Sequence, residues 1–460
     1  MASRLPTEIY AMIIQCVVND RHGKSPKEMR ALCEKHLYTH PASQRLSVGI
    51  KAQWLLCFSL AVEPRRAYAV RSLKCKFWPE YYDHQAWVET LGLSPNLTHL
   101  ELVWLDEPPE DFREQMGNLL SACPRVTEFK FQACWGRSSG DEPSTETAQQ
   151  FTKFAKQLRR LQVLSSFEWL KDMILPYKYP NLESFTVNGG NERHRERDIF
   201  RPLSTQMPSL KTLNIEGAED VSLQDLRDGC KVWGKTLRSF YINHFPVENR
   251  RDGILSHLLP HLTALEELVV GPHSDLPLSD IQAIAKPVTP RLKAFRWVVD
   301  DGIFGNDPLA NPVNVNKATI DIFNAHASTL HTFIIEESFD FWNFGMDIFQ
   351  HLHKAEGLKN LRVQLHDRPT EEEIGCLLRA CPKLGESETG LMVVKEFLTE
   401  CTLATMKYKE DNMEESESSW GHVPQPIGVV KWSQTYSKLS SNCLADLSLT
   451  NSLIPNSIAT

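Results

Sequence analysis

The sequence predicts an α/β solenoid, a stack of short units that each contribute one strand and one outer helix. The apolar pattern Φ-x-x-Φ-x-Φ, in which Φ is an apolar residue, recurs at intervals of about 28 residues between positions 70 and 363. Between its copies lie segments with apolar residues at spacings of three and four, which is typical of a helix with one buried face. A unit of this size cannot bury its apolar face alone, so consecutive units must stack side by side.

The strand of each unit is predicted from the last two apolar positions of the pattern. They are two residues apart, so their side chains point to the same face of an extended chain. The stretch YPNLESFTVNG at 179–189 is thus repeated as MPSLKTLNIEG at 207–217. The first apolar positions of the eleven copies are Val70, Leu97, Val126, Leu158, Leu182, Leu210, Leu237, Leu265, Leu292, Leu330 and Leu358.

The helix of each unit is predicted to end at a proline that often stands two residues before the next copy. Proline lacks a backbone N–H and disfavours the helical conformation of the residue before it, so it ends the helix and starts an extended segment. The prolines at or near this place are Pro95, Pro124, Pro180, Pro208, Pro290 and Pro382. The clearest helical spacing predicts helices over 111–124, 222–234, 317–328 and 371–382.

From about residue 66 to residue 385 this pattern resembles the leucine-rich-repeat family in its longer, helix-containing form. The resemblance implies a horseshoe of strand–helix units, with the strands on the concave face. The family usually places Asn or Cys eight residues after the first apolar position, where the side chain satisfies backbone groups in the bend. Only Cys134 fits that rule.

The residues that alternate with the apolar strand positions are predicted to point away from the core, onto the concave face. Their charges have both signs and aromatic members are present, which suits a protein partner better than a phosphate backbone. The alternative is an ordinary solvated face. The residues predicted to face a target protein are Lys130, Gln132, Thr186, Asn188, Asn214, Glu216, Tyr241, Asn243, Arg296, Glu336, Arg362 and Gln364.

The first residues break the repeat and predict a helix that is entered at a proline. Apolar residues between positions 9 and 17 share one face of that helix. The residues Leu5, Pro6, Glu8, Ile9, Ile13 and Val17 match L-P-x-E-I-x-x-x-I-x-x-x-Φ. This stretch resembles the opening of an F-box, and the resemblance implies that these residues bind the Skp-type adaptor of an SCF (cullin-RING) ubiquitin ligase. The alternative is a helix that only caps the solenoid.

The domain organisation follows from these segments. We expect a small helical F-box-like region at 1–62, a leucine-rich-repeat domain at 63–400 and a flexible, acidic and serine-rich tail at 401–460. Together they predict the substrate-recognition subunit of an SCF-type E3 ubiquitin ligase. The alternative function is a non-catalytic interaction scaffold with a vestigial F-box.

Composition excludes several other classes of protein. The formal net charge of −8 argues against a nucleic-acid partner. No stretch is apolar for long enough to predict a membrane span. The 11 cysteines are scattered without a C-x-x-C pair, which predicts free thiols in a reducing compartment, cytoplasmic or nuclear. No phosphate loop, G-x-S-x-G or H-E-x-x-H motif occurs, so we expect no catalytic residue, no metal and no cofactor.

Overall fold

The computed structural model describes residues 50–77, 84–105, 109, 111–133, 143–165, 173–188, 199–216, 222–243, 253–271, 276–286, 291–299, 312–337, 347–363, 370–384 and 391–393. All of them belong to one compact unit, which spans Met1–Thr405. The predicted adaptor-binding residues Leu5, Pro6, Glu8, Ile9, Ile13 and Val17 lie outside the described residues, as do Cys134, Gln364 and the tail at 401–460.

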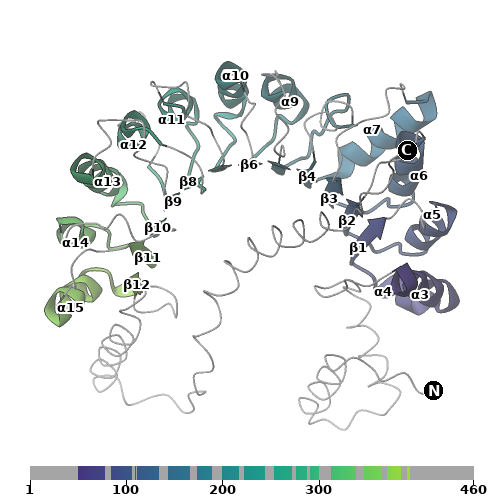
Figure 1. Cartoon of the computed structure of the whole chain (residues 1–460), viewed down its shortest axis with the longest axis horizontal. Coiled ribbons are helices and arrows are strands. Elements are labelled where there is room, and N and C mark those ends of the chain that lie inside the picture. The colour runs from purple at the N-terminus through teal and green to yellow at the C-terminus, as the bar shows by residue number, and fades with distance from the viewer. Residues whose placement is uncertain are drawn as a thin grey trace, which may run out of the picture. The chain divides into compact units, whose positions relative to one another are not determined.

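The strands of the described residues form one parallel sheet of 12 strands, in which every strand pairs with its neighbours in the chain. This chain-order, all-parallel arrangement confirms the predicted solenoid of strand–helix units (Figure 1). The strands are β1 (Ser72–Phe77), β2 (His99–Trp104), β3 (Glu128–Ala133), β4 (Arg160–Leu164), β5 (Ser184–Asn188), β6 (Thr212–Glu216), β7 (Ser239–Ile242), β8 (Glu267–Val270), β9 (Ala294–Val299), β10 (Thr332–Glu337), β11 (Asn360–Val363) and β12 (Leu391–Val393).

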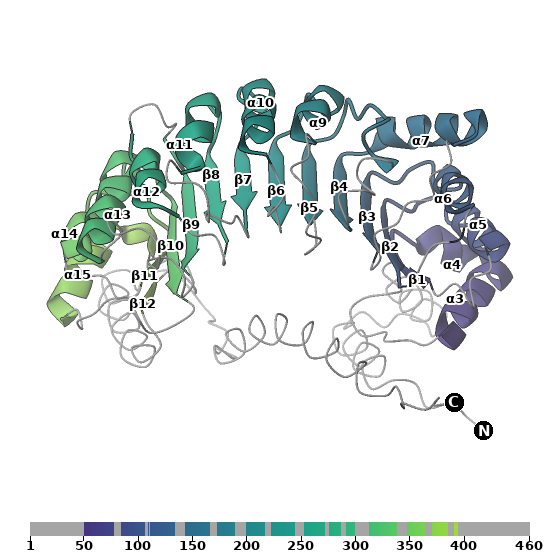
Figure 2. The same ribbon diagram turned by 45° about the horizontal axis from the view of Figure 1, so that its top comes forward.

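The helices line the outer side of the arc and the strands line its inner side (Figures 1 and 2). Parallel neighbours require a crossover between each pair of strands, and among the described elements an outer helix lies in every crossover except the one between β4 and β5. The helices are α3 (Ile50–Val62), α4 (Pro64–Ala69), α5 (His84–Gly92), α6 (Phe112–Ser121), α7 (Thr145–Gln157), α9 (Phe200–Gln206), α10 (Leu223–Trp233), α11 (Leu255–Leu258), α12 (Leu278–Ile284), α13 (Pro312–His326), α14 (Asp347–Leu352) and α15 (Glu371–Ala380).

The four helices predicted from apolar spacing are all present as α6, α10, α13 and α15. One predicted boundary is wrong, because α13 begins at Pro312 rather than at Lys317. Proline is well tolerated in the first turn of a helix, where its missing N–H would have no partner in any case. A helix therefore starts at this proline, although proline usually signals an interruption.

The core lies between the sheet and the outer helices, and the predicted apolar positions fill it. Each of the eleven first apolar positions is at most 1% exposed. The strand positions that follow are buried as well, and Leu213, Phe240 and Leu268 are fully buried and in register across β6, β7 and β8. Each such side chain contributes about 1.5–3 kcal/mol by its removal from water.

Four of the corners before strands are fixed by side chains that bond to the preceding coil. At each of these four, the residue before the first apolar position donates a hydrogen bond to a main-chain carbonyl one coil earlier. These bonds join Asn96 to Tyr68 at 2.9 Å, Gln157 to Cys123 at 2.9 Å, Asn181 to Lys156 at 2.7 Å and Thr329 to Leu292 at 2.8 Å. They satisfy carbonyls that helices and strands leave unpaired at the corner.

Two buried aspartates join neighbouring outer helices. Asp225 of α10 accepts hydrogen bonds from three consecutive main-chain N–H groups at the start of α9, at 2.5 to 2.8 Å. Asp280 of α12 accepts from the N–H groups of Ile254 and Ser256 at the start of α11, at 2.6 and 2.9 Å. The first N–H groups of a helix have no partner within the helix, so each carboxylate caps the helix of the preceding unit.

His326, at the end of α13, is buried and bridges two units. Its Nδ1 accepts from the main-chain N–H of Leu292 at 3.2 Å, and its Nε2 lies 2.9 Å from the carbonyl of Ile284. Since Nδ1 accepts, the proton is on Nε2, which donates to that carbonyl, and the ring is neutral. Burial lowers the pKa of His326, the Ile284 carbonyl opposes the effect, and the nearby Arg291 adds to the lowering.

This lowered pKa predicts that stability depends on pH. Below the ordinary histidine pKa the unfolded chain binds a proton that the folded chain does not, so stability falls as the pH drops through about 6.5. We expect the protein to melt at a lower temperature at about pH 5.5 than at about pH 7.5. In His326→Gln, which has no ionisable ring, this difference should shrink. Equal pH dependence in the two proteins would contradict the assignment.

Candidate recognition surface on the concave sheet

Two rows of side chains run across the inner face of the sheet, and we call this surface the concave face. The first row includes Lys74, Glu101, Lys130, Gln162, Thr186, Asn214, Tyr241, Val269, Arg296, Ile334 and Arg362, which are in register from strand to strand. The second row includes Val103, Gln132, Leu164, Asn188, Glu216, Val298 and Glu336. The main-chain N–H groups of Asn243 and Gly271 continue the ladder to the preceding strand, so these two residues extend the second row.

Of the twelve residues predicted to face a target, eleven are described, and all eleven lie in these two rows; Gln364 lies outside the described residues. That they contact a target remains a prediction. Sequence reasoning missed Lys74 and Gln162 as members of the same rows. Both could have been predicted from the sequence, because Lys74 and Gln162 each stand between two apolar strand residues, as the predicted residues of the first row do.

The N-terminal part of the concave face holds a small ion network. Glu101 of β2 lies 2.7 Å from the ammonium group of Lys74 and 3.2 Å from that of Lys130. Burial acts to raise the pKa of Glu101, but the hydrogen bond from Lys74 and the charges of both lysines outweigh burial and hold its pKa below the ordinary value. Glu101 is thus a carboxylate held between two cations.

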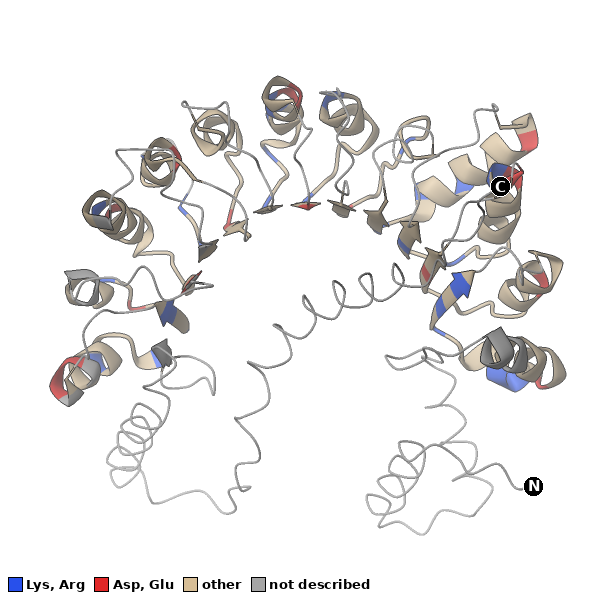
Figure 3. Cartoon of the chain, in the orientation of Figure 1, with Lys and Arg blue, Asp and Glu red and all other residues tan. Residues whose placement is uncertain are grey.

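The C-terminal part of the concave face has a second network of the same kind. Glu336 of β10 lies 3.1 Å from the guanidinium of Arg296 and 2.8 Å from that of Arg362. One carboxylate again lies between two cations, so each of the two networks carries a net charge of about +1 near neutral pH. Figure 3 shows blue segments on strands toward both ends of the sheet and a red segment near its middle.

The middle of the concave face is polar but carries little charge. The Asn188 amide donates to one oxygen of Glu216 at 3.3 Å, and the Asn214 amide donates to the other at 3.1 Å. Tyr241 stands on the next strand. Burial raises its pKa to about 12, the charge of Glu216 acts in the same direction, and Arg296 and a hydrogen bond with Asn243 oppose the rise.

A glycine keeps the space beside Tyr241 open. A Cβ at Gly271 would lie 2.7 Å from the Tyr241 hydroxyl and 2.8 Å from Cγ of Asn243. Both distances are too short for a side chain to fit without displacing the tyrosine. The small residue therefore lets the Tyr241 hydroxyl lie across the neighbouring coil, where Asn243 fixes it.

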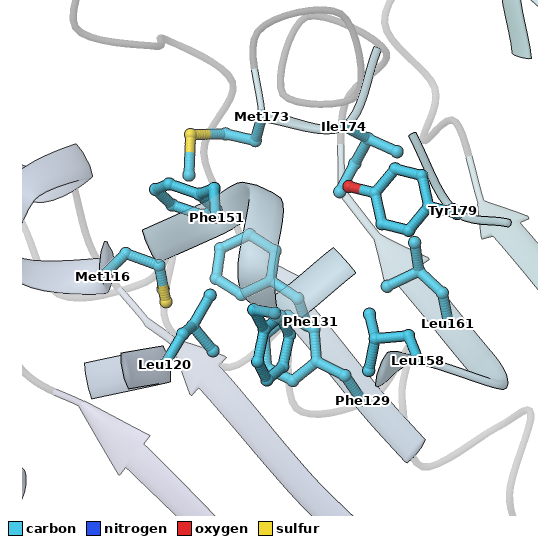
Figure 4. A pocket seen from close by; sticks show the side chains of 11 residues that line it. Met116, Leu120, Phe129, Phe131, Phe151, Leu158, Leu161, Met173, Ile174 and Tyr179 are labelled. Carbon is cyan, nitrogen blue, oxygen red and sulfur yellow. The ribbon is translucent and has the colours of Figure 1, made fainter. Parts of the chain in front are cut away.

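An apolar cavity of about 30 Å³ lies between the sheet and the outer layer at β3 and β4. Figure 4 shows Met116, Phe151, Met173 and Tyr179 among the side chains that line it. The chain from β4 to β5 is short, and its described part, 173–183, contains no helix as long as α7 beside it. The cavity lies where the outer layer changes from the long helix α7 to this segment without a long helix. The one titratable side chain of its lining is Tyr179, whose pKa is raised by burial, so the hydroxyl stays protonated and the lining has no charged group to bind a charged ligand.

Other features of the described residues give no sign of a catalytic site. In that part of the chain no group of three His, Cys, Asp or Glu side chains is placed to hold a metal ion. Burial raises the pKa of the Cys75, Cys123 and Cys230 thiols, so they are poor nucleophiles. No helix of the described segments is long and apolar enough to cross a membrane.

The described fold and surface define a leucine-rich-repeat solenoid with an open, mainly polar sheet face. No family model and no curated protein matches the sequence. Among the solved structures that resemble the fold are the following two. One is the leucine-rich repeat-containing protein LegL7 from Legionella pneumophila, at 12% identity and a TM-score of 0.41, covering 64% of this chain and 92% of that chain. The other is a chain of the Rad7 and Elc1 complex in yeast, at 12% identity and a TM-score of 0.37, covering 86% of this chain and 98% of that chain.

Proposed function

We propose that the protein is the substrate-recognition subunit of an SCF-type (cullin-RING) E3 ubiquitin ligase. The observation that carries the proposal is the sequence Leu5-Pro6 with Ile9 and Ile13, which resembles an F-box opening and stands ahead of the repeats. In this function the N-terminal segment binds the Skp-type adaptor, and the concave face binds a target protein.

An exposed apolar surface at the N-terminal end of the solenoid supports the proposal. The helix α3 begins at Ile50 and leads through α4 into β1. Phe58 and Val62 of α3 are 67% and 61% exposed, and Tyr68 of α4 is 60% exposed. Phe58 and Val62 are four residues apart on α3 and so are neighbours on its surface, and neighbouring exposed apolar side chains are typical of a protein-binding site.

The proposed mechanism requires no covalent chemistry from this chain. A receptor that holds the adaptor at one end and the target on its sheet raises the effective concentration of target lysines near the ligase. The protein would act in the cytoplasm, the nucleus or both, where cullin-RING ligases work. The opposing possibility is a scaffold that binds proteins through its sheet without an adaptor.

Co-precipitation of a Skp-type adaptor with the full-length protein distinguishes the two functions. We expect wild-type protein to retain the adaptor and Leu5→Ala with Pro6→Ala to retain at least about tenfold less, since both residues match the motif positions that bind. Gln15→Ala, in the same segment but outside the motif, serves as the control and should behave as wild type. If wild-type protein retains no adaptor, or the double variant retains it fully, the scaffold function is favoured.

A further inference from the structure

Glu216 differs from Glu101, Glu128 and Glu336, three other carboxylates of the sheet, in its neighbours. Glu101 and Glu336 each lie between two cations, as described above, and Glu128 lies 2.8 Å from His99 and 3.5 Å from Arg160. Glu216, near the middle of the sheet, has only the amides of Asn188 and Asn214 as hydrogen-bond partners among the described residues. Within the described segments it is therefore a carboxylate of the concave face that forms no ion pair.

The surroundings of Glu216 hold the carboxylate in place without neutralising it. Each of its oxygens accepts one amide N–H, which fixes the plane of the carboxylate, and each oxygen can accept at least one more hydrogen bond. The buried Asn214 side-chain oxygen has no partner among the described residues, and the amide nitrogen of the same side chain donates to Glu216. A side chain fixed in this way loses little conformational entropy when it binds a partner.

Tyr241 adds an aromatic ring beside this carboxylate. Asn214 and Tyr241 are directly in register on β6 and β7, and the charge of Glu216 acts on the Tyr241 hydroxyl. A carboxylate next to an aromatic ring suits a guanidinium or ammonium group, which can form an ion pair with the one and a cation–π contact with the other. An arginine can also bind both carboxylate oxygens at once.

We propose that Glu216 and Tyr241 form a subsite for one basic side chain, an arginine or a lysine, of the target protein. This inference rests on the proposed role of the concave face in target binding. Asn188 and Asn214 position the carboxylate, and Asn243 with Gly271 positions the tyrosine.

The two flanking networks define the rest of the target surface. The networks around Glu101 on β2 and Glu336 on β10 each have an excess of positive charge, and each lies four strands from β6. Neighbouring strands are about 4.8 Å apart, so each network lies about 19 Å along the sheet from Glu216. The complementary target presents a basic side chain with acidic side chains about 19 Å away on both sides.

Selection from a random linear peptide display library on the full-length protein tests the subsite. With wild-type protein we expect one position of the selected peptides to be enriched in arginine or lysine. The enrichment should disappear with Glu216→Gln and change to aspartate or glutamate with Glu216→Lys. Because an unfolded variant cannot select a new consensus, the change of preference in Glu216→Lys also shows that the surface is intact.

Titration of the selected peptides gives the size of the effect. Replacing the enriched arginine with citrulline, which has the same shape but no charge, should weaken binding to wild-type protein at least about tenfold. The same replacement should have little effect on Glu216→Gln. The control is Glu183→Gln, which removes an exposed carboxylate that pairs with Lys211 at 3.0 Å, outside the two rows; it should behave as wild type.

Two results would overturn the subsite. One is a wild-type selection without an enriched basic residue, and the other is a basic preference that survives in Glu216→Gln. Neither result bears on the proposed function as a whole, because retention of the adaptor depends on the N-terminal segment and is measured separately. If wild-type protein retains no adaptor but still selects a basic residue, the subsite is supported and the protein is a scaffold without an adaptor.

Discussion

Replacing Phe240 with alanine is expected to lower the free energy of unfolding by about 3–5 kcal/mol. Phe240 is fully buried on β7, and its neighbours in register, Leu213 on β6 and Leu268 on β8, are fully buried as well. The change removes a large ring from between three coils and leaves a cavity that the rigid sheet cannot close. Urea unfolding followed by circular dichroism measures the loss.

Val232→Ala is the matched control for this change. Val232 lies in α10 and is 49% exposed, so its truncation should alter stability by no more than about 0.5 kcal/mol. A loss of that small size for Phe240→Ala as well would mean that the strand phase is wrong and that the apolar positions do not form the core between coils.

Asp280→Ala is expected to cost about 2–4 kcal/mol, because it leaves main-chain N–H groups at the start of α11 buried without an acceptor. Burial raises the pKa of Asp280, and the N–H groups oppose that rise, so the carboxylate is itself costly to bury and the loss is smaller than the sum of the bonds. Asp280→Asn keeps one acceptor oxygen and should lose less. Hydrogen exchange should accelerate first at the amides of Ile254 and Ser256.

The control for Asp280 is Asp228→Ala on α10. Asp228 pairs with Lys231 at 2.7 Å on the surface, where water and salt screen the pair, so its loss should change stability little. Unchanged exchange at Ile254 and Ser256 in Asp280→Ala would show that the buried carboxylate does not hold the start of α11.

The strand phase could be predicted from the sequence because each strand repeats one simple rule. A residue such as Ile215 is apolar and is buried, and the next residue, Glu216, is polar and reaches the concave face. The alternation of side chains across a strand makes this prediction local, so no distant contact is needed. The fold class and the two rows of the concave face follow directly.

The contacts between units could not be predicted in the same way. Asp225 and Asp280 look like ordinary first-turn acids of their own helices, and only the stacked structure shows that each caps the helix of the preceding unit. The pairing on the concave face depends equally on register. Arg296 reaches Glu336 diagonally across β9 and β10, whereas Glu216 finds only amides. The alternation of apolar and polar residues along each strand therefore predicts which residues lie on the concave face but does not predict which of them pair with one another.

Adaptor binding and peptide binding, each measured in two variants, separate the role of the N-terminal segment from that of the concave face. Adaptor binding is assigned to the segment that contains Leu5 and Pro6, and target binding to the surface that contains Glu216. Leu5→Ala with Pro6→Ala should therefore lose the adaptor and keep the arginine-containing peptide. Glu216→Lys should keep the adaptor and lose that peptide. If either variant loses both activities, or neither variant loses the one assigned to it, the division of labour between the N-terminal segment and the concave face is contradicted.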